Sequence, residues 1–455
     1  MFVKSPFVRN LILLILVVIA VLGFLQNLKI QQLAGMGDMR GRVAGARLIL
    51  DGKLPYYYNW YPGDPVRYYY GGEVDSPRVA PTVVSGLTAP PAFLRAIGPI
   101  ANAEQYKIDW GAFYLFHILW LCGLVFTLSK VSRDKWYIVL LLMVPFLWSD
   151  GWMNQVLISQ YYALFGFMLL AIGLLLLRNK QIAAGLLFAV LILFRLNTLV
   201  FVLPFLIAAW YYRKFLFSSA TGLLVYAVFV AVTPFEKQLW QQYFSSLKDH
   251  QELHMGKMPP APMARIVTLP TLPTIVEGQD YHAMDKAYKE SDIRIFMEAS
   301  NFKEGYKAVM GRQPPAMMLS ICLLGTILFV WVWMYRKRKM RTDAFDFPEY
   351  KHVLAGMLFY FLSSFFSTIS NASYQFPQWL AVAVILGLYQ TKIATKAILL
   401  FVFGVLVNCY WFPDFRGKHL ISEVCLLAAT LWVIIMPSRA ESHSSSAVAS
   451  SSVQH

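Results

Sequence analysis

Charged residues are scarce in this chain. They make up 14% of its 455 residues, and the acidic sign is the scarcer, with 25 Asp and Glu against 40 Lys and Arg. A soluble protein of this length needs more surface charge, whereas 58% of this chain is hydrophobic. Several uncharged runs approach or exceed the ~20 residues that cross a bilayer as a helix. The composition therefore excludes a soluble globular protein and predicts a polytopic membrane protein.

Cysteine is also scarce, and the common nucleotide-binding motifs are absent. The four cysteines (Cys122, Cys322, Cys409 and Cys425) lie in or beside apolar runs, without metal spacing or a disulfide framework. We find no Walker loop, Rossmann glycine pattern or Gly-x-Ser-x-Gly elbow. The chain thus offers no cytosolic nucleotide-binding domain. Its net charge of +15 is dispersed over short loops, which favours membrane topology over nucleic-acid binding.

The apolar runs predict an all-α polytopic membrane protein, a bundle of about twelve transmembrane helices. The first run lacks a small-residue cleavage site and is interpreted as a retained signal anchor. The predicted spans are approximately 8–29, 110–129, 136–149, 157–177, 181–194, 197–212, 215–233, 314–335, 350–369, 377–390, 396–412 and 419–436.

Basic clusters in the short loops, such as Arg336–Arg341, place both termini in the cytoplasm. The expected setting is a bacterial inner membrane, with the lipid bilayer as a partner. The predicted parts are an N-terminal transmembrane module (1–233) that includes a first outer loop (30–109), a second outer loop (234–312), a C-terminal transmembrane module (313–437) and a disordered cytoplasmic tail (438–455).

Two amphipathic helices are expected in the first outer loop, along the membrane surface. Asp38 can cap a helix from about Met39 to Asp51, and Gly52 can end it. An apolar stripe on this helix consists of Val43, Ala46, Ile49 and Leu50. The second helix is predicted at about 80–97.

Asp38 is the strongest candidate for chemistry. As a helix cap it needs no further function, but a carboxylate beside lipid can also serve as a general base, because partial desolvation makes it a better proton acceptor. Arg40 and Arg47 lie seven residues apart, nearly on one helical face. They can contact lipid headgroups or form a cradle for a phosphate. Tyr57 and Trp60 can belong to an interfacial aromatic belt or stack on a sugar ring.

Three further candidates lie in or beside later spans. Arg195 and Asn197 interrupt an apolar run, and a charge at such a position usually faces a cavity or a partner. Gln160 stands at the start of another span. His250, His254 and His282 lie in the second outer loop. The H-x3-H spacing of the first two lacks a convincing third ligand, so no metal site is predicted.

These features resemble the GT-C type of lipid-linked-sugar glycosyltransferases, and most closely glycosyltransferase family 87, which is similar to polyprenol-phosphate-mannose-dependent mannosyltransferases. The resembling residues cover roughly 8–212. They are a span followed by GDMRGRVAGARLILDGKLPYY, then VAPTVVSGLTAPPAFL, then NQVLISQYYALFGFMLLAIGLLLLRNKQIAAGLLFAVLILFRLNTLVFVLPF.

The resemblance implies a role for individual positions. Asp38 matches the family's catalytic Asp, and Gln160 matches its Gln, with Ser159 where a Gly is usual. Arg195 stands where the family often has Lys followed by Pro, although Leu196 follows here.

The implied reaction is an inverting sugar transfer from a polyprenyl-phosphate donor to a hydroxyl of a glycolipid or glycan acceptor on the outer face. Asp38 would take the proton, and Arg40, Arg47 and Arg195 would bind the donor phosphate, with or without a divalent cation. The other expected substrate contacts are Gln160, Asn197, Tyr57 and Trp60.

Two other functions fit the same residues. A transporter or flippase of a lipid-linked glycan would use a basic, aromatic outer surface without chemistry, although no internal duplication is evident. A scaffold for envelope synthesis is the other alternative. The sequence leaves the sugar open: mannose, glucose, another hexose or arabinofuranose.

Overall fold

The structure is a computed structural model of the whole chain. It describes residues 5–33, 37–58, 60, 63–69, 88–255, 275–280, 283–284, 286–287, 290–291, 300–339, 348–369 and 373–436.

The chain is an all-α polytopic membrane protein, as predicted. Its helical elements are α1 (Pro6–Leu33), α2 (Gly37–Leu50), η1 (Val66–Tyr68), α4 (Pro91–Ala101), α5 (Gln105–Lys130), η3 (Arg133–Lys135), α6 (Trp136–Met143), η4 (Val144–Trp148), α7 (Asp150–Leu157), α8 (Tyr162–Leu177), α9 (Gln181–Phe194), η5 (Leu196–Val202), α10 (Leu203–Leu206), α11 (Arg213–Val232), α12 (Pro234–His254), α14 (Phe302–Met310), α15 (Ala316–Lys339), α16 (Glu349–Phe365), η6 (Ser373–Trp379), α17 (Leu380–Leu388), α18 (Thr395–Val407) and α19 (Lys418–Ile435). Two short strands, β1 (Ile275–Val276) and β2 (Gln279–Asp280), pair antiparallel.

Within the described residues, five helices are long and apolar enough to cross a membrane: α1, α5, α11, α15 (over Ala316–Lys337) and α19. A sixth span is possible by length if α7 and α8, which meet at a bend of 118°, count as one. Each predicted span contains a helix, but several are too short to cross alone, among them α6, α9 and α17. The predicted count of twelve transmembrane helices is therefore not confirmed.

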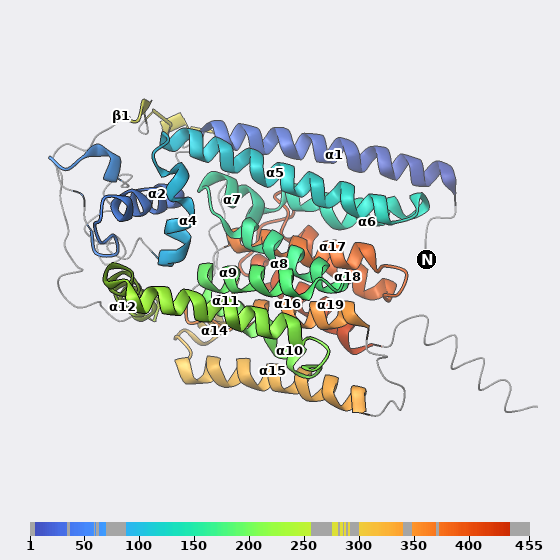
Figure 1. Cartoon of the computed structure of the whole chain (residues 1–455). Helices are drawn as coiled ribbons and strands as arrows, with labels where there is room; N and C mark the ends of the chain where they lie inside the picture. The colour runs from blue at the N-terminus through green and yellow to red at the C-terminus, as the bar shows by residue number, and fades with distance from the viewer. Residues whose placement is uncertain are drawn as a thin grey trace, which may run out of the picture.

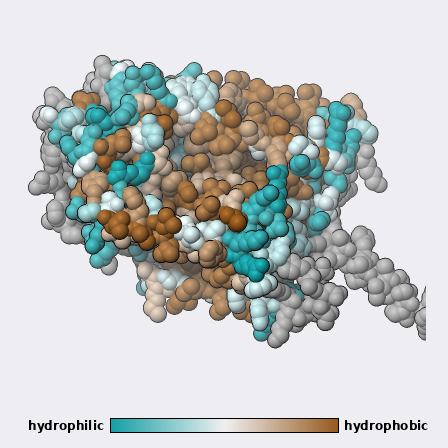
Figure 2. Space-filling model, viewed as in Figure 1, coloured by the Kyte–Doolittle hydropathy of each residue, from teal (hydrophilic) through white to brown (hydrophobic). Residues whose placement is uncertain are grey.

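The surface shows how such a bundle meets lipid. A broad band of apolar side chains separates two hydrophilic ends (Figure 2). The helices α1, α5 and α15 run along this band, while α2, α4, α12 and β1 gather at one end (Figure 1). We call that the α2 end.

The helix α2 is nearly enclosed by protein. Val43, Ala46 and Ile49 are buried, as the apolar stripe predicts, but Leu50 is exposed. Gly52 ends the helix with a φ of 71°, while Lys53 N–H donates to the Leu48 carbonyl at 2.8 Å.

Two expectations about the helices at this end are corrected. The helix α2 begins at Gly37, so Asp38 lies within its first turn and does not precede it as a cap. The second helix, α4, covers Pro91–Ala101 because Pro90 and Pro91 set its start; of the expected 80–97, residues 80–87 lie outside the described residues.

A buried ion pair joins the two halves of the chain. Lys418 Nζ lies 2.8 Å from Asp150 Oδ2 and also donates to the Cys409 carbonyl at 3.0 Å. Both charged side chains are at most 2% exposed. The pair thereby fixes the start of α19 against the start of α7, close in sequence to the bend that leads into α8.

Candidate active site

The first turn of α2 brings a carboxylate beside a cation. Asp38 and Arg42 are one helical turn apart, and Arg42 Nη1 lies 4.0 Å from Asp38 Oδ2. The Asp38 side chain is 46% exposed, whereas that of Arg42 is 8% exposed. A carboxylate in the first turn also faces the positive end of the helix dipole, which stabilises its charge.

Arg42 remains a cation despite its burial. Burial alone would lower the pKa of its guanidinium, but Tyr161 and Asp38 raise that pKa and outweigh burial. Its Cζ lies 4.4 Å from the centre of the Tyr161 ring, a cation–π contact. Arg42 thus presents permanent positive charge next to the exposed carboxylate of Asp38.

The bend between α7 and α8 supplies two adjacent tyrosines. The rings of Tyr161 and Tyr162 are stacked, with centroids 5.4 Å apart and planes 8° apart. Tyr161 also stacks on Phe93 of α4, with ring centroids 4.2 Å apart. Ser159, just before the bend, has a φ of 49°. This left-handed conformation is one that glycine adopts most readily, which fits the glycine expected here from the resemblance.

Arg195 contacts the second tyrosine of this pair. Its Cζ lies 4.5 Å from the centre of the Tyr162 ring and 5.5 Å from that of Tyr360. Its Nε donates to Asn197 Oδ1 and its Nη2 to Gln375 Oε1, each at 3.1 Å. The guanidinium therefore has a defined orientation.

Local structure explains how Arg195 reaches this position. The helix α9 ends at Phe194, and Arg195 has an extended backbone with φ −156° and ψ 95°. Thr198 closes the next turn by donating its hydroxyl to the Arg195 carbonyl at 2.7 Å. Asn197 is held in turn, because its amide donates to Ser363 and Ser364 of α16 at 3.2 and 3.3 Å.

A third tyrosine-bearing element, α12, completes the group. Burial raises the pKa of Tyr243 on α12, with Tyr161 acting in the same direction and Arg195 in the opposite one. Tyr243 therefore stays protonated and can donate a hydrogen bond. We call Tyr161, Tyr162, Tyr243 and Tyr360 the tyrosine cluster. Arg195 contacts the Tyr162 ring, and Asp38 has a weaker electrostatic interaction with the same tyrosine.

Other predicted residues have different surroundings. Arg47 donates to the carbonyls of Ala101, Arg67 and Ala103 at 2.6–2.8 Å and pairs with Glu277 at 2.5 Å. These contacts tie α2 to neighbouring segments, and they give its predicted phosphate contact no geometric support.

The remaining arginine of α2, Arg40, is also buried. It interacts electrostatically with Asp109 on α5 and with Tyr69. Gln160 is fully buried, and neither atom of its amide has a hydrogen-bond partner within the described residues. Its predicted substrate contact stays a prediction.

The two predicted aromatic contacts, Tyr57 and Trp60, follow α2 and bond to residues outside the candidate site. The Tyr57 hydroxyl donates to Asp249 of α12 at 3.0 Å, and burial together with this bond raises the pKa of Tyr57 to about 12. The Trp60 indole donates to the Pro65 carbonyl at 3.2 Å and packs edge-on against Tyr69. Both contacts shape the segment after α2.

Arg42, Tyr161 and Tyr162 are not among the site residues predicted from the sequence. The spacing of Asp38 and Arg42, one helical turn, was the available signal for Arg42. No sequence pattern indicated Gln375 or Tyr360, because they reach the site from helices that are distant in sequence. Among the described residues, no group of three or more His, Cys, Asp and Glu can hold a metal ion. His282 lies outside the described residues.

Fold and site together define a polytopic membrane protein with a carboxylate, two guanidinium groups that contact tyrosine rings, and a tyrosine cluster. The sequence model of glycosyltransferase family 87 matches residues 88–364 of this chain, which is more than half of its length. The chain belongs to this family and is a membrane glycosyltransferase. No curated protein and no solved structure matches it.

The extent of the match differs from the expected resemblance over 8–212. It begins after Asp38 and Arg42 and continues into α16, so it includes Gln160, Arg195 and Tyr360. The candidate roles of Asp38 and Arg42 therefore depend on their geometry.

Proposed function

We propose that the protein transfers a sugar from a polyprenyl-phosphate donor to an acceptor hydroxyl, with inversion and with Asp38 as the general base. One observation supports this most: an exposed carboxylate lies 4.0 Å from a buried cation, Arg42, which contacts Tyr161 while Arg195 contacts the neighbouring Tyr162. A base and cations for a leaving phosphate are the groups that such a transfer needs.

The proposed reaction has one displacement. Asp38 accepts the proton of the acceptor hydroxyl, whose oxygen attacks the anomeric carbon. The bond from that carbon to the phosphate oxygen breaks on the opposite face, which inverts the configuration. Polyprenyl phosphate leaves with its negative charge next to Arg42 and Arg195. Tyrosine hydroxyls that stay protonated, such as that of Tyr243, can donate to the phosphate or the sugar.

The lipid part of the donor needs an apolar surface. A groove of about 450 Å³ lies between α1, α5 and the segment of α6 and η4. Its lining comes from Val17, Ala20, Val21, Phe24, Tyr114, His117, Ile118, Trp120, Leu121, Leu124, Leu140 and Leu147. Since α1 and α5 are candidate membrane spans, this groove suits an isoprenoid chain that stays within the bilayer.

Setting and orientation belong to the same proposal. We place the α2 end on the outer face of a bacterial inner membrane, both termini in the cytoplasm, and the fold in the GT-C type. Mannose is the preferred sugar, and a glycolipid or glycan is the acceptor. Arg40, Gln160, Tyr57 and Trp60 remain candidate contacts of these substrates. A divalent cation remains a candidate aid to the leaving phosphate.

The test uses purified protein in lipid nanodiscs with a donor labelled in both its sugar and its lipid. We expect release of polyprenyl phosphate in step with transfer of the sugar to a glycan acceptor. A flippase would move the donor intact across the bilayer of proteoliposomes. Movement of intact donor without release of polyprenyl phosphate would overturn the proposal.

A further inference from the structure

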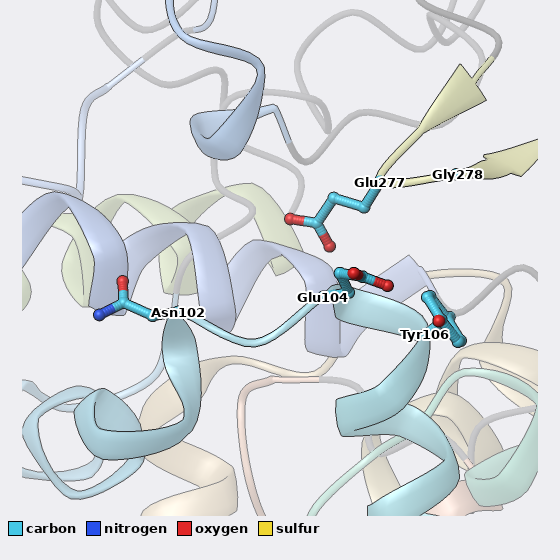
Figure 3. Close-up of a pocket in the computed structure, with 5 residues that line it drawn as sticks. All are labelled: Asn102, Glu104, Tyr106, Glu277 and Gly278. Atoms are coloured by element: carbon cyan, nitrogen blue, oxygen red, sulfur yellow. The ribbon is translucent and has the colours of Figure 1, made fainter.

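Amide oxygens orient Arg195, whereas carboxylates hold two arginines at the α2 end. Arg47 Nη1 lies 2.5 Å from an oxygen of Glu277, whose side chain is among those that line a pocket of about 500 Å³ (Figure 3). Arg95 Nη2 lies 2.5 Å from Glu236 Oε1. A carboxylate orients an arginine and also offsets its charge toward an anion, while a neutral amide oxygen only orients it.

Two amides accept hydrogen bonds from the Arg195 guanidinium. Its Nε donates to Asn197, two residues along the chain, and its Nη2 donates to Gln375 of η6, which is distant in sequence. Asn197 is fixed in turn by two serines of α16. Gln375 is therefore the amide that orients Arg195 from another part of the chain.

The position of η6 defines where the Gln375 amide lies. Gly151 of α7 allows η6 to approach closely, because a Cβ at this glycine would lie 2.5 Å from Phe376 Cβ. On the other side of Gln375, Gln378 accepts a hydrogen bond from the Tyr360 hydroxyl of α16. Both neighbours of Gln375 within η6 are thus packed or bonded against other helices.

Arg195 and Arg42 act on neighbouring tyrosines. Arg195 contacts the Tyr162 ring and Arg42 contacts the Tyr161 ring, while both cations interact electrostatically with Tyr162. A phosphate that leaves beside these cations is stabilised most when their positive charge is retained and their donors already point at it. An amide acceptor on Arg195 meets both conditions, since it directs the guanidinium and adds no negative charge.

We propose that Gln375 is a positioning residue, which directs the Arg195 guanidinium toward the leaving phosphate without neutralising it. The inference rests on the proposed function, because it takes Arg195 as a contact of that phosphate. It adds a role for η6 and a requirement for a neutral acceptor at residue 375.

The experiment measures binding, without turnover. The ligands are farnesyl phosphate, a short polyprenyl phosphate, and farnesol, which is the same lipid without the phosphate. The full chain is held in phosphatidylcholine nanodiscs, so that a site for any lipid phosphodiester is already occupied, and calorimetric titration of empty nanodiscs gives the blank. We expect the wild type to bind farnesyl phosphate about tenfold or more tightly than farnesol, because the phosphate makes charge-assisted bonds.

Two variants of Gln375 separate positioning from stability. Gln375→Glu places a carboxylate on Arg195, so we expect it to bind farnesyl phosphate about tenfold more weakly than the wild type and farnesol equally well. Its melting temperature should not fall, since the bond to Arg195 becomes charge-assisted. Gln375→Met adds no charge and removes the acceptor, and it should weaken farnesyl phosphate binding about threefold. The matched control is Gln241→Glu at an exposed position of α12, which should bind like the wild type.

Equal affinity of the wild type and Gln375→Glu for farnesyl phosphate would overturn the inference, as would an equal loss of affinity for both ligands. If Gln375→Glu does not fold, Gln375→Met decides: a lower melting temperature with an unchanged preference for farnesyl phosphate would assign the amide a structural role alone. The expected binding pattern together with no release of polyprenyl phosphate in the transfer assay would contradict the proposed function alone.

Discussion

Two acid–base pairs differ sharply within this molecule. Asp150 Oδ2 lies 2.8 Å from Lys418 Nζ, with both side chains at most 2% exposed, whereas Asp38 Oδ2 lies 4.0 Å from Arg42 Nη1 and its side chain is 46% exposed. Lys418 also donates to the Cys409 carbonyl, so the first pair is enclosed by protein contacts. Asp38 keeps a face open. An enclosed pair stabilises the fold, and an open one can exchange a proton with a substrate.

The largest expected effect concerns the enclosed pair. Lys418→Met leaves the buried Asp150 carboxylate without its partner, which costs about 3–5 kcal/mol of unfolding free energy. Asp150→Asn should cost less, because Asp414 still lies 3.8 Å from Lys418. Thermal unfolding of the purified protein measures the loss, and the double variant should lose less than the sum of the two single losses. Single variants that melt like the wild type would show that the pair does not hold the halves together.

The open pair is expected to respond in activity. Arg42→Gln removes a cation beside the leaving phosphate, which we expect to lower kcat about 10²–10³-fold with little change in melting temperature. Arg42→Lys keeps the charge but loses the guanidinium that contacts the Tyr161 ring, so an intermediate rate is expected. Arg133→Gln, an exposed change on η3, serves as the control. A turnover rate of Arg42→Gln equal to that of this control would contradict the role of Arg42 beside the leaving phosphate.

Arg47 sharpens the comparison because it shares a helix with Arg42 but bonds to backbone carbonyls and Glu277. Arg47→Gln should lower the unfolding free energy by about 1.5–3 kcal/mol. The donor KM of the folded variant should not change, and this is measured alongside melting. A higher donor KM with unchanged melting would instead support the phosphate contact that its sequence position predicts.

The smallest effect is expected at the bend before the tyrosine cluster. Ser159→Gly relieves a left-handed conformation, worth about 0.5–1 kcal/mol of unfolding free energy, but it removes a hydroxyl that hydrogen-bonds the Asp109 side chain. Because the two effects oppose each other, we expect a net change in unfolding free energy of at most about 1 kcal/mol, measured by thermal unfolding. A larger decrease would mean that the bond to Asp109 outweighs the relief of strain.

The sequence was a good guide to local features. The apolar runs predicted where helices occur, and Gly52 predicted the end of α2. Hydropathy does not fix helix length, however, because a run of apolar residues continues through breaks such as the bend of 118° between α7 and α8. The sequence pattern therefore predicted full membrane spans where the bundle contains shorter helices.

The site was predicted only in part, for a related reason. Asp38 and Arg195 were recognisable as charges in unusual places, but the choice among Arg40, Arg42 and Arg47 depends on which neighbours each one meets. Arg47 donates to carbonyls at the end of α4 and in the α4–α5 connection, and Arg42 contacts the Tyr161 ring. These contacts join segments distant in sequence, so no local pattern encodes them.

The central claim is that Asp38 takes the acceptor proton. Its most direct test is the single-turnover rate of Asp38→Asn with a labelled polyprenyl-phosphate sugar, measured on protein that melts and binds donor like the wild type. We predict that transfer falls below detection while donor binding persists. Transfer at a rate near that of the wild type would contradict the account.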